Sequence, residues 1–112
     1  MKIAMPIAEG KLAAHFGHCA QFALVEIDAS TNTALGTHYV EAPAHEPGLL
    51  PQWLHEQGAD VVITGGMGRC AQGIFAEQGI KVVVGVPAAF PEEIVSAYLE
   101  GSLETGENLC DH

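Results

Sequence analysis

Apolar positions along this chain follow two different spacings, which separate strands from helices. Alternating or continuous runs of apolar and β-branched residues are typical of strands, whereas apolar residues at i, i+3 and i+4 are typical of helices. The strand pattern covers residues 2–7, 21–28, 34–41, 61–64 and 80–86. The helical pattern covers residues 49–57, 70–78 and 91–100, which are followed by Gly58, Gly79 and Gly101. Because glycine commonly ends a helix, the predicted order of elements is β-β-β-α-β-α-β-α.

Two of these strands, 61–64 and 80–86, consist mostly of apolar residues, which is expected for strands covered on both faces. The turn-forming residues 29–33 join the second and third strands into an antiparallel hairpin. The expected fold is therefore a single three-layer α/β domain, with a mixed, mainly parallel five-stranded sheet and helices on both faces. If strands 2–7 and 61–64 are neighbours, the loops that follow them meet at one edge of the sheet.

A glycine turn, residues 65–68, follows the strand 61–64 and precedes a helix. Its glycines are expected to adopt backbone conformations closed to other residues. Such a turn exposes backbone N–H groups and the positive end of a helix dipole, which suits an anion, but it equally allows strand and helix to pack closely. The turn lacks the lysine and Ser/Thr of a P-loop and the glycine spacing of a dinucleotide site, which argues against a nucleotide. The candidate anion-binding residues are Gly65, Gly66, Gly68 and the chain's only arginine, Arg69, whose alternative is exposure to solvent.

Thiols and imidazoles gather in three places along the chain. Thiolate sulfur and imidazole nitrogen are ligands that suit iron-sulfur, copper, zinc and molybdenum-sulfur species. The candidates are His15, His18 and Cys19 in the first loop, Cys70 at a helix start, and Cys110 and His112 at the end of the chain. Each has an ordinary alternative: a loop histidine bonded to a carbonyl, a small cysteine that fills space behind the turn, or a disordered end. The tail, residues 102–112, is accordingly either a ligand-bearing arm or a loosely held terminus.

Charge and composition argue against several functions. The chain of 112 residues has 4 basic and 14 acidic side chains and a net charge of −10. Nucleic acid is not an expected partner, since phosphate contacts come mainly from lysine and arginine. No apolar run approaches the roughly 20 residues of a membrane span and no signal sequence is found, so a soluble, cytoplasmic protein without membrane contact is predicted. Three cysteines in such a chain argue for reduced thiols.

Catalytic patterns are not evident. The chain has no Ser-His-Asp pattern and no pair of isolated acids typical of general acid/base catalysis. A ribonuclease-like reaction would need carboxylates that converge on Mg²⁺, and the strand acids Glu26, Asp28 and Asp60 are not expected to converge. A non-enzymatic function is therefore expected.

Four motifs, in their order and spacing, resemble one protein family. They are His15-Phe16-Gly17-His18-Cys19 with Phe22 after it, residues 59–68, residues 75–82, and Tyr98-Leu99-Glu100-Gly101. The chain resembles the dinitrogenase iron-molybdenum cofactor biosynthesis family, which includes NifX, NafY, the C-terminal domain of NifB and many small stand-alone members. The resemblance covers essentially residues 1–112 as one domain. The His18-Cys19 pair and the Cys-x-His ending are closer to the small stand-alone members than to the nitrogenase carriers.

The resemblance implies a ribonuclease H-like topology and a protein that binds an iron-sulfur or molybdenum-containing cluster, or its precursor. Such a protein carries the cluster between donor and acceptor assembly proteins, and a preparation made without them is expected to be apo. The resemblance also implies that His15 is the family's cofactor-binding histidine. A monomer or weak homodimer is expected. Two alternatives stay open: a thiol-based redox protein that uses Cys70 or Cys19, and a zinc-binding interaction module whose tail folds over the metal.

Overall fold

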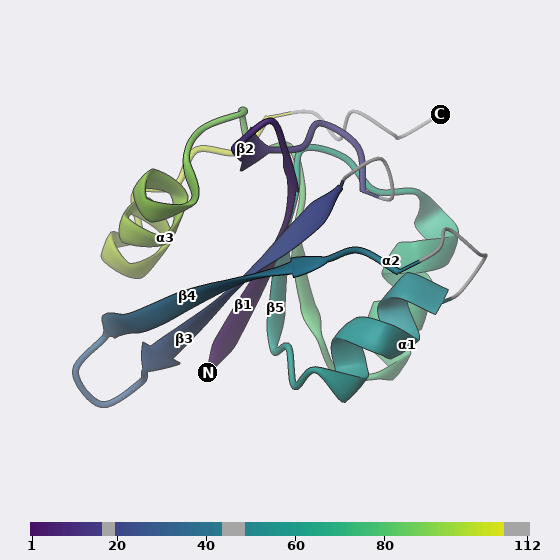
Figure 1. The fold of residues 1–112 in the computed structure, drawn as a ribbon, viewed down its shortest axis with the longest axis horizontal. Helices are drawn as coiled ribbons and strands as arrows, with labels where there is room; N and C mark the ends of the chain where they lie inside the picture. Colours follow the sequence, from purple (N-terminus) through teal and green to yellow (C-terminus); the bar gives the residue numbers. More distant parts are fainter. Residues whose placement is uncertain (17–19, 44–48, 107–112) are drawn as a thin grey trace.

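The computed structural model describes residues 1–16, 20–43 and 49–106 of the chain. Within these ranges it forms one mixed sheet and three helices (Figure 1). The strands are β1 (Lys2–Ala8), β2 (Lys11–Leu12), β3 (Gln21–Asp28), β4 (Thr33–Glu41), β5 (Val61–Ile63) and β6 (Lys81–Val83). The helices are α1 (Leu49–Glu56), α2 (Arg69–Glu77) and α3 (Pro91–Glu100). The strand order is β4-β3-β1-β5-β6, with β2 paired to β1.

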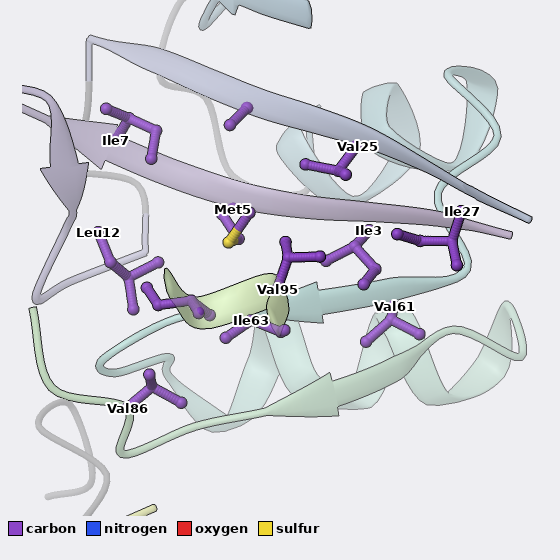
Figure 2. Packing of buried hydrophobic residues seen from close by; sticks show 12 residues of the cluster. Ile3, Met5, Ile7, Leu12, Val25, Ile27, Val61, Ile63, Val86 and Val95 are labelled. Atoms are coloured by element: carbon purple, nitrogen blue, oxygen red, sulfur yellow. The ribbon is translucent and has the colours of Figure 1, made fainter. Parts of the chain in front are cut away.

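The helices cover both faces of the sheet. α3 lies over one face, and α1 and α2 lie over the other (Figure 1). Figure 2 shows the core under α3, where Ile3 and Met5 of β1 pack in one cluster with Val95 of α3. The core on the opposite face includes Leu54 of α1 and Phe75 of α2. The prediction of a single α/β domain with helices on both faces of a mixed sheet is confirmed.

β1 is the centre of the sheet because it pairs with neighbours on both sides. It runs antiparallel to β3, and it runs parallel to β5 with Ile3 opposite Val61. The first and fourth predicted strands, residues 2–7 and 61–64, are therefore neighbours. Since parallel strands end at the same edge of a sheet, this pairing brings the first loop and the glycine turn to that edge.

Two expectations about the sheet composition are wrong. Six strands rather than five lie in the described residues, because Lys11 and Leu12 pair with the end of β1 as β2. The sheet is not mainly parallel either, since three of its strand pairings are antiparallel and two are parallel. The hairpin of β3 and β4 pairs directly with β1, which gives the central strand one antiparallel side. The ribonuclease H-like topology stays a prediction.

The predicted strand 80–86 is also shorter than its apolar run, because β6 covers only Lys81–Val83. Gly85 has a left-handed backbone, with φ of +77°, which turns the chain out of the strand. β6 lies at the edge of the sheet, and both of its faces are partly covered, since Val83 packs against the core under α3 and Val82 packs against the core on the opposite face. Among the described residues, no helix is long and apolar enough to cross a membrane.

The hairpin turn is fixed to α3 by Asn32. This residue has a left-handed backbone, with φ of +57°, and its Nδ2 donates to the carbonyl oxygen of Leu99 at 2.8 Å. Asn32→Ala is expected to lower the free energy of unfolding by about 1–2 kcal/mol, because alanine tolerates this conformation less well and lacks the hydrogen bond. Asn32→Gly, which loses only the side chain, is expected to cost less in the same urea titration. Equal losses in the two variants would assign the effect to the hydrogen bond and not to the backbone.

Candidate functional site

The glycine turn and the first loop are in contact at the edge of the sheet where β1 and β5 end. The N–H of Gly65 donates to the carbonyl oxygen of Ala13 at 3.3 Å. A Cβ at Gly65 would lie 2.9 Å from the carbonyl oxygen and 3.0 Å from the Cα of Ala14, which is closer than an ordinary contact. Glycine is therefore needed at position 65 because two backbone segments approach each other there.

Two expectations about the glycine turn are corrected by its backbone. Gly65 is not among the residues with positive φ, and Gly68 has φ of −67° and ψ of 158°, a conformation open to any residue. The N–H of Gly65 already has the Ala13 carbonyl as its acceptor, so it is not available to an anion. The alternative interpretation of the turn, close packing, therefore holds at Gly65, while an anion-binding role for Gly66, Gly68 and Arg69 stays a prediction.

Phe16 holds the first loop against this turn. Its N–H donates to the carbonyl oxygen of Gly66 at 2.7 Å. Its half-buried ring packs edge-on against Phe75 of α2 and Phe22 of β3, with ring centroids 5.6 and 5.8 Å apart. His15, the preceding residue, is exposed beside this anchor. The two residues of the His-Phe motif thus have different surroundings: the phenylalanine packs on the core, and the imidazole lies at the surface.

The start of α2 lies directly after the glycine turn. Gly68 is its N-cap residue, and no side chain of the described residues caps the helix. Arg69 and Cys70 in its first turn are exposed, and Cys70 is a free cysteine. The alternative that Cys70 is a small buried residue is therefore wrong. An exposed thiol in the first turn of a helix is accessible to a metal or an oxidant.

The C-terminal segment returns to the same edge, which the sequence pattern did not indicate. The N–H of Gly106 donates to the carbonyl oxygen of Gly85 at 2.6 Å, and the N–H of Gly85 donates to that of Gly65 at 2.9 Å. A Cβ at Gly85 would collide with Gly106, so glycine is required there for space as well as for its φ. In the sequence, this contact could have been inferred from Gly85 itself, because a glycine inside an apolar run often marks a close approach of two backbone segments.

Thr64 is a second residue of the edge that sequence reasoning missed. It is fully buried, and its Oγ1 donates to the carbonyl oxygen of Gly66 at 3.3 Å. Its own N–H donates to the carbonyl oxygen of Val83 at 3.0 Å. Thr64 thus stabilises the glycine turn through these hydrogen bonds. In the sequence, the only feature that could have indicated this role is its position between an apolar strand and two glycines.

The remaining candidates are not placed. His18, Cys19, Cys110 and His112 lie outside the described residues, so their role as ligands stays a prediction. Within residues 1–16, 20–43 and 49–106, no group of three or more His, Cys, Asp or Glu residues is arranged to hold a metal ion. Of the predicted ligands, His15 and Cys70 are the two that lie in the described residues, and both are exposed.

Two of the strand acids contact the same residue. Lys2 contacts two of them: its Nζ lies 3.4 Å from Glu26, and its backbone N–H donates to Oδ2 of Asp60 at 2.9 Å. Both acids lie beside Lys2 because this residue begins the strand between β3 and β5. Asp28 is turned to Ser30, whose hydroxyl and backbone N–H hold the pKa of Asp28 below its usual value.

The chain is thus a small α/β domain whose first loop and glycine turn meet at one end of the sheet, with an exposed imidazole on the loop and an exposed thiol at the start of α2. The chain belongs to the dinitrogenase iron-molybdenum cofactor family, whose model matches residues 1–101. A curated relative, the uncharacterized protein MJ0580 of Methanocaldococcus jannaschii, is 31% identical over 110 residues, which cover 96% of this chain and 92% of the relative.

Two solved structures have closely similar folds. The crystal structure of PH0822 is 30% identical, with a TM-score of 0.88 and coverage of 97% of both chains. The apo form of the orange protein (ORP) from Desulfovibrio gigas is 26% identical, with a TM-score of 0.72 and coverage of 96% of this chain and 93% of the other. Family membership and the relation to dinitrogenase cofactor proteins are thus established by the chain as a whole rather than by one motif.

Proposed function

We propose that this protein binds an iron-sulfur or molybdenum-containing cluster, or its precursor, as cargo and carries it between assembly proteins. The observation that carries the proposal is the hydrogen bond from the Phe16 N–H to the Gly66 carbonyl, at 2.7 Å. This bond holds the loop that bears His15 against the turn that leads to Cys70. An imidazole and a thiol, both exposed, are thereby presented from two segments that lie far apart in the sequence.

The chemistry of the edge fits such a cargo. Imidazole nitrogen and thiolate sulfur are suitable ligands for iron and for metal-sulfur clusters. Clusters with inorganic sulfide and thiolate ligands are commonly anionic, and the uncapped start of α2 with Arg69 in its first turn offers positive potential. This matters in a chain with a net charge of −10. Family membership supports the same class of cargo.

The C-terminal residues are within reach of the same edge. Gly106, the last described residue, is hydrogen bonded to Gly85, which is itself hydrogen bonded to Gly65. Cys110 follows four residues later in the sequence, and four residues span at most roughly 14 Å. We therefore propose Cys110 and His112 as an arm that completes the ligand set, together with His18 and Cys19 of the first loop.

In this proposal the protein acts in the cytoplasm without catalysing a reaction, and its partners are the proteins that donate and accept the cluster. Ligands on a surface edge suit transfer, because a partner's own ligands can approach the cluster there. A monomer or weak homodimer leaves this edge open. An apo state after purification is expected, since loading depends on the donor.

The test is anaerobic reconstitution of the full chain with iron and sulfide, with and without tetrathiomolybdate. After desalting, visible absorption and elemental analysis are expected to find stoichiometric metal and a charge-transfer band. Cys70→Ser is expected to lower the retained metal several-fold, because it removes an exposed sulfur ligand. Ala76→Ser is the matched control, since it adds the same side chain at an exposed position of α2 away from the helix start.

Three results would contradict the proposal. Absence of retained metal under every condition would exclude a cluster carrier. Rapid alkylation of one thiol without any chromophore would favour the thiol-based redox protein, for which the exposed Cys70 is the relevant observation. Binding of one colourless zinc ion in preference to iron would favour the zinc-binding module.

A further inference from the structure

A hollow lies between the end of α3 and the edge strand β6. Its volume is about 450 Å³, which falls within the roughly 300–1,000 Å³ of small-molecule sites. Val83, Leu99 and Leu103 provide apolar walls, and Lys81 and Tyr98 lie beside them. Lys81 is the first residue of β6 and pairs with the first residue of β5, whereas the glycine turn follows the end of β5. Lys81 therefore lies at the opposite end of the β5–β6 pair from the glycine turn, and no candidate cluster ligand lines the hollow.

The charge of this hollow is unusual for the molecule. The whole chain carries 14 acidic against 4 basic side chains, yet no residue that lines the hollow is an aspartate or a glutamate. Lys81 is exposed, and its Nζ lies 5.6 Å from the centroid of the Tyr98 ring. In the described part of the chain, no carboxylate lies within ion-pair distance of this ammonium group. A cation without a carboxylate partner thus stands beside an apolar surface.

The walls are held in place by contacts that do not depend on a ligand. Asn32, which also lines the hollow, donates from Nδ2 to the carbonyl oxygen of Leu99 at 2.8 Å and so joins the hairpin turn to the end of α3. Gly101 ends α3 with φ of +78°, and the N–H of Ser102 donates to the carbonyl oxygen of Ala97 at 2.9 Å. These contacts direct the following segment, with Leu103, back toward β6. The hollow is accordingly preformed.

We propose that this hollow is a second ligand site, for a small organic anion with an apolar body, such as an aryl-substituted carboxylate. The anionic group lies at Lys81, because the carbonyl groups at the end of α3 carry negative partial charge and repel it from the other end. The apolar body lies on Val83, Leu99 and Leu103, and an aromatic body gains a further contact with Tyr98. The proposal does not depend on the cluster function, since it uses none of the candidate cluster ligands.

The test compares phenylpropionate with its uncharged analogue, phenylpropionamide, as probes for the full chain. Amide chemical shifts measured by NMR are expected to change at Val83, Leu99 and Leu103 during titration with the carboxylate. Lys81→Gln is expected to weaken binding of the carboxylate about fivefold, the effect of one solvent-exposed ion pair. It is expected to leave binding of the amide unchanged.

Lys11→Gln is a matched control for the charge and the ring contact. Lys11 also lies over an aromatic ring, with its Nζ 5.3 Å from the centroid of Phe90, but it does not line the hollow. This variant is expected to bind phenylpropionate like the unmodified chain. The proposal is overturned if the carboxylate does not bind, if carboxylate and amide bind equally well, if the shifts change at the glycine turn instead, or if the two lysine variants behave alike.

Discussion

Replacing His15 with alanine is expected to lower cluster retention after anaerobic reconstitution about tenfold or more, while leaving the stability of the domain unchanged. The imidazole is exposed, so its removal opens no cavity in the core. Phe16 holds the loop in place through its N–H and its ring. The loop is therefore expected to keep its position in the variant, and the lost function is expected to come from the lost ligand alone.

The measurement combines metal analysis after desalting with the midpoint of urea unfolding of the apo protein. His38→Ala is the matched control, because His38 is also exposed but lies in β4, at the far edge of the sheet from β5. It is expected to retain metal like the unmodified chain. If His15→Ala unfolded the domain, or if both variants lost metal equally, His15 would be a structural residue or one of many nonspecific metal-binding groups.

The largest loss of stability is expected for Gly65→Ala, at about 2–3 kcal/mol. The new methyl group would lie 2.9 Å from the carbonyl oxygen of Ala14, and backbone atoms cannot move aside as a flexible side chain can. The two segments must separate, which also weakens the hydrogen bonds from Gly65 to Ala13 and from Phe16 to Gly66. Because these contacts position His15, cluster retention is expected to fall together with stability, unlike in His15→Ala.

Gly68→Ala tests whether this cost comes from close approach or simply from the loss of a glycine. A Cβ at Gly68 meets no atom within 4 Å, and the backbone at Gly68 is open to any residue. The expected cost is therefore about 1 kcal/mol or less, from the change at the helix N-cap. Urea titrations of the two variants give the comparison. Similar costs for Gly65→Ala and Gly68→Ala would show that the contact with Ala14 does not constrain the turn.

The hydrophobic pattern predicted most elements because strands and helices are specified largely by residues that are near one another in the chain. Gly58, Gly79 and Gly101 were predicted to end helices, and each has a positive φ in the structure. The predicted strand 80–86 was too long because its apolar spacing is that of a strand, whereas the conformation of Gly85 depends on contacts with Gly65 and Gly106. A local sequence pattern does not indicate a contact with a residue that is distant in the sequence.

The candidate site divides in the same way. His15 and Cys70 were singled out because their side-chain chemistry can be read without a structure, and the structure shows that both are exposed. The chain's acidic balance, its glycine turn and the order of its motifs likewise come from the sequence alone. The pairing of β1 with β5 decided that the first loop and the glycine turn adjoin. Only the tertiary structure revealed that Gly65 serves close packing, that Phe16 is the anchor, and that Gly106 returns to the same edge, because each depends on backbone atoms of distant segments meeting in space.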